Sequence, residues 1–123
     1  MEDWQLDFEW LRARNFVKAA FNLDKLPDLQ AILMLIGIQE AQQLKDDYSK
    51  EEKQDLMHVA VCALFALDNY YELDHFDADG WPHYKLMAPL PYTDVKSQEL
   101  ALKALIIRYL DLDKHEKDVI IEN

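Results

Sequence analysis

The apolar positions of this sequence are densest between residues 56 and 67, where His58 is the one polar side chain. Ser49 stands before the run, with Glu52 three residues further on, which is typical of a capping box at the start of a helix. No glycine or proline interrupts the run, so the pattern predicts a helix over about 50–69. Because the run is apolar on every side, we expect a central helix that other elements cover from all directions.

A second apolar run, at 31–38, predicts another helix over about 26–45. Pro27 suits its first turn, where a backbone N–H is not needed. Gly37 interrupts this run and costs a helix about 1 kcal/mol relative to alanine, so we expect a second backbone to cross close to it. The short connection at 46–48 predicts that the two apolar helices pack as antiparallel neighbours.

Residues 3–21 show a third apolar pattern, with the spacing of a helix that buries one broad face. Trp10 falls outside this face, and we expect it to reach a second element or a partner. The face consists of Trp4, Phe8, Leu11, Phe16, Ala19 and Ala20.

Between residues 70 and 87 the pattern changes from helical to alternating. Two aromatic-rich runs flank Asp79 and Gly80, which predicts a β-hairpin, and Pro82 places the second strand at an edge or at its own start. The alternative is an ordered loop held down by its aromatic side chains.

A last helix is predicted over 95–110, with Thr93 or Asp94 as its cap. The charged tail at 111–123 carries three apolar residues near its end, at 119–121. We expect the tail either to be loose or to dock these three residues on a neighbour. The buried stripe of this helix is expected to consist of Val95, Leu102, Leu105, Ile106 and Tyr109. The sequence therefore predicts a single, mainly α domain over 1–123, with a four-helix core and one β-hairpin between the third and fourth helices.

The length and the net charge of the chain limit the kinds of function and partner that we expect. The 123 residues fit one domain. The net charge of −11 repels nucleic acid and anionic membranes, so neither is an expected partner. There is no basic, apolar leader and no apolar run long enough to span a bilayer, and Cys62 has no second cysteine with which to form a disulfide. We therefore expect a cytoplasmic protein in which Cys62 is a buried packing residue.

Carboxylates and a histidine recur every three residues at the start of the central helix. Glu52, Asp55 and His58 fall on adjacent turns, and Glu40 on the preceding helix is placed to face them. Carboxylate-x-x-His is a unit of di-metal sites in helix bundles, so these four residues are candidate metal ligands. The alternative interpretation makes Glu52 a cap, Asp55 a solvated side chain and His58 a residue at the edge of the core.

The same carboxylates resemble those of the all-α nucleoside-triphosphate pyrophosphatases, which hold magnesium with E-x-x-E on one helix and E-x-x-D on the next. Glu52 and Asp55 match the second motif, whereas Glu40 is followed by Gln43 where the first motif has a carboxylate. This resemblance implies an alternative function, that of a Mg²⁺-dependent nucleotide pyrophosphohydrolase, and Mg²⁺ is a cofactor only under that alternative. The missing carboxylate weakens the site for a hard cation.

Aromatic side chains of the predicted hairpin are a candidate binding surface. Three helices followed by a hairpin is also the order of a winged-helix domain, so a nucleic-acid binder is a further alternative. Such a domain needs exposed Arg or Lys on its recognition helix, and the third helix here is apolar after Lys53. No Ser/His/Asp or Cys/His arrangement is recognised in the sequence. The candidate binding residues are Tyr71, Trp81, His83 and Tyr84.

Three stretches, at 35–40, 50–58 and 79–86, resemble a group of small cytoplasmic proteins of Bacteroidetes-type bacteria to which no activity is assigned. The resemblance implies a bacterial single-domain protein and no catalytic residues. The helices also carry more apolar surface than a lone four-helix bundle needs, and two-fold homodimers are the commonest assembly. We therefore expect a non-catalytic interaction module whose partner is a second copy of itself or another protein.

Overall fold

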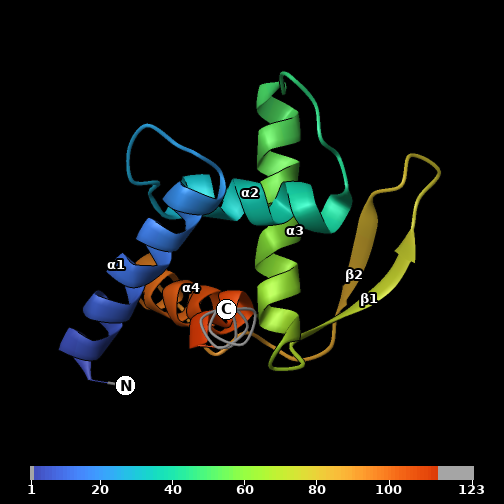
Figure 1. The fold of residues 1–123 in the computed structure, drawn as a ribbon. Helices are drawn as coiled ribbons and strands as arrows, with labels where there is room; N and C mark the ends of the chain where they lie inside the picture. The colour runs from blue at the N-terminus through green and yellow to red at the C-terminus, as the bar shows by residue number, and fades with distance from the viewer. Residues whose placement is uncertain (1, 114–123) are drawn as a thin grey trace.

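The computed structural model describes residues 2–113 and contains, within them, four helices and one two-stranded hairpin. The elements are α1 (Asp3–Ala20), α2 (Leu29–Ala41), α3 (Lys50–Ala66), β1 (Tyr71–Phe76), β2 (Pro82–Leu86) and α4 (Val95–Leu110). The hairpin lies between α3 and α4 in the chain, so the predicted fold class is confirmed. Figure 1 shows α3 in the centre, α2 across it, α1 and α4 on one side and the hairpin on the other.

The capping box predicted for α3 is confirmed. Ser49 Oγ accepts a hydrogen bond from the Glu52 N–H at 3.1 Å, and the Glu52 carboxylate accepts one from the Ser49 N–H at 3.0 Å. The helix ends at Ala66, before the predicted boundary, because the chain turns there and Asn69 adopts a left-handed conformation with a φ of 67°. His58 lies on an exposed side, so α3 is covered on most sides but not on all. The fully buried residues of its apolar run are Leu56, Val59, Ala60, Cys62, Leu64 and Phe65.

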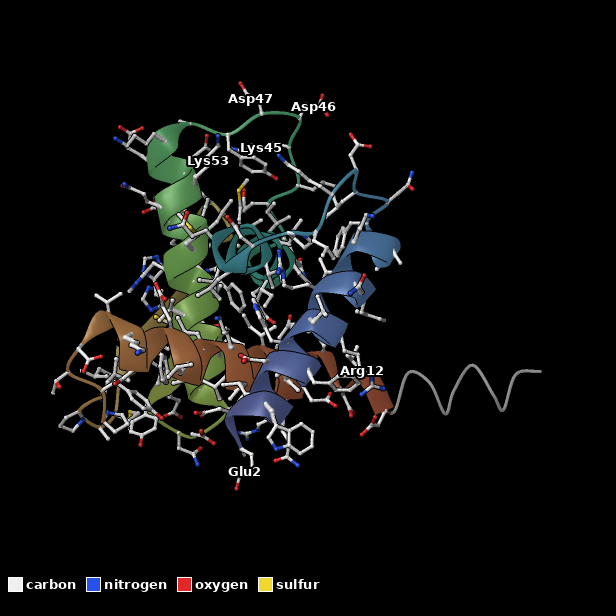
Figure 2. All side chains as sticks on the ribbon, turned by 90° about the vertical axis from the view of Figure 1, so that its left-hand side faces the viewer. Glu2, Arg12, Lys45, Asp46, Asp47 and Lys53 are labelled. Atoms are coloured by element: carbon white, nitrogen blue, oxygen red, sulfur yellow. The ribbon has the colours of Figure 1, made fainter. Side chains whose placement is uncertain are left out.

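The contact between α2 and α3 depends on Gly37. A Cβ atom at this position would lie 2.0 Å from the carbonyl oxygen of Leu56, so only glycine permits the backbones to approach this closely. The close crossing predicted from Gly37 is confirmed. The predicted antiparallel pairing is wrong, because α2 runs across α3 in Figure 1 and is seen nearly end-on in Figure 2, where α3 still stands upright.

Both ends of α2 lie inside the predicted boundaries. Asp28 caps the helix by accepting a hydrogen bond from the Ala31 N–H at 2.8 Å, so Pro27 precedes the cap and does not lie in the first turn. Gln42 adopts a left-handed conformation with a φ of 53°, which ends the helix after Ala41. The connection to α3 is therefore longer than the tight loop that was predicted.

The first helix packs on the core through the face opposite to the predicted one. Lys103 Nζ of α4 lies 5.7 Å from the centre of the Trp10 ring, which confirms that Trp10 reaches a second element. Trp4 and Phe8, predicted to be buried, are 68% and 62% exposed. The predicted face is wrong because α1 carries two apolar stripes, and the sequence pattern does not say which one meets the core. The buried residues of α1 are Trp10, Ala13 and Val17.

The last helix has the predicted bounds, and Asp94 caps it by accepting a hydrogen bond from the Ser97 N–H at 2.7 Å. Val95 was expected in the buried stripe, but it is exposed because the buried part of α4 begins only at Leu102. Beyond α4, Leu112 is buried. The rest of the predicted tail, at 114–123, lies outside the described residues.

The hairpin is confirmed over the alternative of an irregular loop. β1 and β2 pair antiparallel from Tyr71 opposite Leu86 to Phe76 opposite Pro82, with a bulge between Leu73 and His75. The hairpin packs against α3 and the end of α2, where Trp81 and Tyr84 contact a small core cluster of Ala41, Leu56 and Val59.

Candidate functional site

A cleft of about 360 Å³ opens between α3 and the end of the hairpin that carries the turn. It brings together residues that the sequence assigned to two separate candidate sets. Asp55 and His58 come from the metal-ligand set, and Trp81, His83 and Tyr84 come from the binding-surface set. The cleft is lined by Asp55, His58, Val59, Cys62, Asp77, Trp81, Pro82, His83 and Tyr84.

The α3 wall of the cleft holds a histidine and a cysteine that are one turn apart. His58 Nε2 lies 3.6 Å from Cys62 Sγ. Burial raises the pKa of Cys62 to about 11, and a hydrogen bond with the Tyr71 hydroxyl offsets part of that rise. At neutral pH Cys62 is therefore a thiol and not a nucleophilic thiolate. The sequence analysis missed this pair, although its spacing of four residues on a helix was a usable signal.

The hairpin wall is organised by Asp77. Its carboxylate accepts hydrogen bonds from the N–H groups of Asp79 at 2.9 Å and Trp81 at 3.0 Å, and from His83 Nε2 at 2.8 Å. The bond from His83 is the chief cause of the lowered pKa of Asp77, followed by the bond from the Trp81 N–H. Asp77 thus holds the turn and fixes the ring of His83 at the cleft.

A second imidazole lies against His83 on the neighbouring strand. The rings of His75 and His83 are opposite each other in the register and stack with centroids 4.8 Å apart. Asp74 Oδ2 lies 2.8 Å from His75 Nδ1, so each ring has its own carboxylate partner. Tyr71, the fourth predicted binding residue, does not line the cleft, and its hydroxyl lies near Cys62.

Glu40 and Glu52, the other predicted metal ligands, lie elsewhere. Glu40 Oε1 accepts a hydrogen bond from Tyr109 Oη at 2.7 Å, which ties α2 to α4, and burial together with this bond raises the pKa of Tyr109 above its usual range. Glu52 caps α3 and forms an ion pair with Lys45. Within residues 2–113, no three His, Cys, Asp or Glu side chains gather closely enough to hold a metal ion.

The outer side of α1 is the largest departure from the predicted burial. Trp4, Phe8 and Leu11 point away from the core, with exposed fractions of 68%, 62% and 47%. Figure 2 views the molecule from this side, with α1 in front of the other described elements. Asn15 continues the same line, and its Nδ2 donates to the Leu11 carbonyl oxygen at 2.9 Å. We call these four residues the outer seam of α1.

No family model, curated protein or solved structure matches this chain. Among residues 2–113 there is no helix with both the length and the apolar character needed to cross a bilayer. The function is therefore inferred from the exposed surfaces and the cleft of this chain.

Proposed function

We propose that this protein is a non-catalytic interaction module in which the outer seam of α1 docks on the same seam of a second copy. The observation that carries this proposal is that α1 buries one apolar face and exposes the opposite one. The largest apolar patch that a protein leaves exposed to water is often a functional surface.

The spacing of the outer seam favours another helix as the docked element. Trp4, Phe8, Leu11 and Asn15 follow one another at intervals of four, three and four residues, which is the spacing of the seam between helices in a coiled coil. Because the Asn15 amide already donates to the helix backbone, covering it leaves that donor satisfied.

The exposed area fits a dimer of this chain. At the observed exposed fractions, Trp4, Phe8 and Leu11 offer roughly 350 Å² of side-chain surface, taking about 200 Å² for each large side chain. Two copies would bury twice that area. Because polar surface makes up about two-fifths of an interface, the total reaches roughly 1,200 Å². This lies at the lower limit of specific interfaces, at about 1,200–2,000 Å², where weak and transient complexes are found, so we expect a dimer in the micromolar range.

The cleft supports binding more than catalysis. The raised pKa of Cys62 keeps it a thiol, and the carboxylate of Asp77 accepts hydrogen bonds from the hairpin turn. Glu40 bonds to Tyr109 and Glu52 forms an ion pair with Lys45, both outside the cleft. The magnesium-dependent alternative needs Glu40, Glu52 and Asp55 to face one pocket. Of these three residues only Asp55 lines the cleft, and this favours the interaction module over the magnesium-dependent alternative.

The test compares Phe8→Asp with Leu44→Asp by sedimentation velocity. Both residues are exposed, at 62% and 85%, but Leu44 lies in the connection between α2 and α3. We expect wild-type protein and Leu44→Asp to dimerise alike and Phe8→Asp to stay monomeric, with the same helix content by circular dichroism. Equal dimerisation of Phe8→Asp and wild type would contradict the proposal.

A further inference from the structure

Two opposite charges flank the outer seam of α1 on the same side. Asp7 immediately precedes Phe8, and Arg14 immediately precedes Asn15. The two charged residues are seven positions apart, which is close to two full turns of a helix, so they point in nearly the same direction. The N-terminal half of this flank is therefore acidic and its C-terminal half is basic.

Neither of these charges has an oppositely charged partner in residues 2–113. Asp7 forms no hydrogen bond or ion pair there, and the guanidinium of Arg14 donates through Nε to the carbonyl oxygen of Pro27 at 2.7 Å. Asp7 and Arg14 cannot reach each other within one helix, since two turns separate them by about 10 Å. The pair is left unformed in the monomer.

The opposite flank of the seam differs. Arg12 lies there and is already occupied, because it forms ion pairs with Glu9 and with Asp113, each at 3.1 Å. The ion pair with Glu9 lies within α1, and the one with Asp113 joins α1 to the segment that follows α4. Of the two flanks, the one that carries Asp7 and Arg14 therefore offers charges that form no ion pair among residues 2–113.

We propose that the two copies pack their α1 helices antiparallel about a two-fold axis, with Asp7 of each copy paired with Arg14 of the other. In an antiparallel pair the same flank of each helix meets across the two-fold axis. The register that aligns these charges also sets Phe8 against Leu11 of the second copy and Trp4 against Asn15. Asp7 and Arg14 would then determine which helix can dock on the outer seam. This inference rests on the proposed dimer.

A parallel arrangement is less favourable for these residues. It would set Asp7 against Arg12 of the second copy, which Glu9 and Asp113 already engage. It would also leave Arg14 of both copies without a charge partner at the interface. The antiparallel arrangement forms two new ion pairs without breaking an existing one.

Charge exchange between α1 helices tests this geometry. Asp7→Arg alone sets Arg against Arg14 twice, and Arg14→Asp alone sets Asp against Asp7 twice, so each variant should dimerise about tenfold more weakly than wild type. Mixing the two variants restores both pairs: one is the wild-type pair of Asp7 with Arg14, and in the other the two charges are exchanged. We therefore expect a heterodimer of near wild-type affinity, detected by native mass spectrometry and sedimentation velocity.

Matched controls separate this effect from the change in net charge. Asp46→Arg and Lys53→Asp make the same charge changes at exposed sites away from α1, which Figure 2 labels, and should dimerise like wild type. Both Arg14→Asp and Arg14→Gln remove the bond to Pro27. Because Arg14→Gln adds no negative charge beside Asp7, it serves as the milder variant, with an expected weakening of about threefold. Circular dichroism melting checks that each variant is folded.

The outcomes distinguish the two proposals. If Phe8→Asp is monomeric while both charge variants dimerise like wild type and the mixture forms no preferred heterodimer, the seam is an interface but the antiparallel pairing is wrong. If Asp7→Arg weakens the dimer and neither Arg14 variant does, the helices pack parallel. A wild-type monomer at all concentrations overturns both proposals.

Discussion

The helices α3 and α1 have similar lengths, of 17 and 18 residues, and both begin with a capping box, yet they are buried very differently. α3 is apolar nearly all round and is covered on most sides by α2, α4 and the hairpin. α1 has one face against the core and another, equally apolar, in water. The apolar surface of α3 is buried and stabilises the fold, whereas the outer apolar surface of α1 stays exposed and is available for association with another molecule.

The largest expected effect contrasts two phenylalanines of these helices. Phe65 of α3 is 1% exposed, and Phe8 of α1 is 62% exposed. Phe65→Ala should lower the free energy of unfolding by about 3–5 kcal/mol, because it leaves a cavity in the core. Phe8→Ala should change it by no more than about 0.5 kcal/mol at concentrations where the protein is monomeric. Urea denaturation measures both, and equal losses would contradict the contrast.

The crossing of α2 over α3 predicts the next effect. A methyl group at Gly37 would collide with the Leu56 carbonyl, which belongs to the backbone and cannot move aside. Gly37→Ala should therefore destabilise the protein by about 3 kcal/mol, although alanine normally favours a helix. Gln39→Ala, at an exposed position of the same helix, is the control and should be nearly neutral. A stabilising Gly37→Ala would show that the crossing is looser than described.

The capping box of α3 predicts a smaller effect. Ser49→Ala removes the acceptor for the Glu52 N–H and should cost about 1 kcal/mol. Thermal melting checks this value, with Gln54→Ala as a comparison, because Gln54 is an exposed residue of the same helix that takes no part in the capping box. Equal losses for the two variants would contradict a specific role of the Ser49 hydroxyl.

The smallest expected effect is the loss of folding stability at acidic pH. The pKa of Glu52 is lowered chiefly by its hydrogen bond with Lys45, and that of Asp77 by the bond from His83. A carboxyl whose pKa is lower in the folded state stabilises the fold above its unfolded pKa, near 4, and loses that contribution as the pH falls through the folded value. Stability should hold from pH 7 to about 5 and decrease below pH 4. Glu52→Gln should flatten this decrease, and an unchanged slope would contradict the assignment.

The features that the sequence predicted correctly depend on local signals. The capping box of Ser49, the close approach at Gly37 and the turn at Gly80 each follow from a few neighbouring residues. The order of helices and hairpin followed from hydrophobic periodicity alone. The capping box and the turn are local structures. The contact at Gly37 is tertiary, but a glycine in an apolar helix is a local sign of such a contact, so it too could be inferred without a structure.

The features that the sequence missed depend on how the elements meet. Trp4 and Trp10 are equally apolar, and only the position of α4 decides that Trp10 is the buried one. His58 and His83 are 25 positions apart and share a cleft because the hairpin folds back onto α3. The crossing of α2 over α3 likewise follows from tertiary packing that a periodic pattern does not encode.

The central claim is that the exposed seam of α1 joins two copies of the chain. Light scattering of the wild-type protein from about 1 to 200 µM tests it most directly, since mass action converts a micromolar dimer from mostly monomer to mostly dimer across that range. The molar mass should rise from that of one chain to that of two, and a molar mass of one chain at every concentration would contradict the proposed dimer.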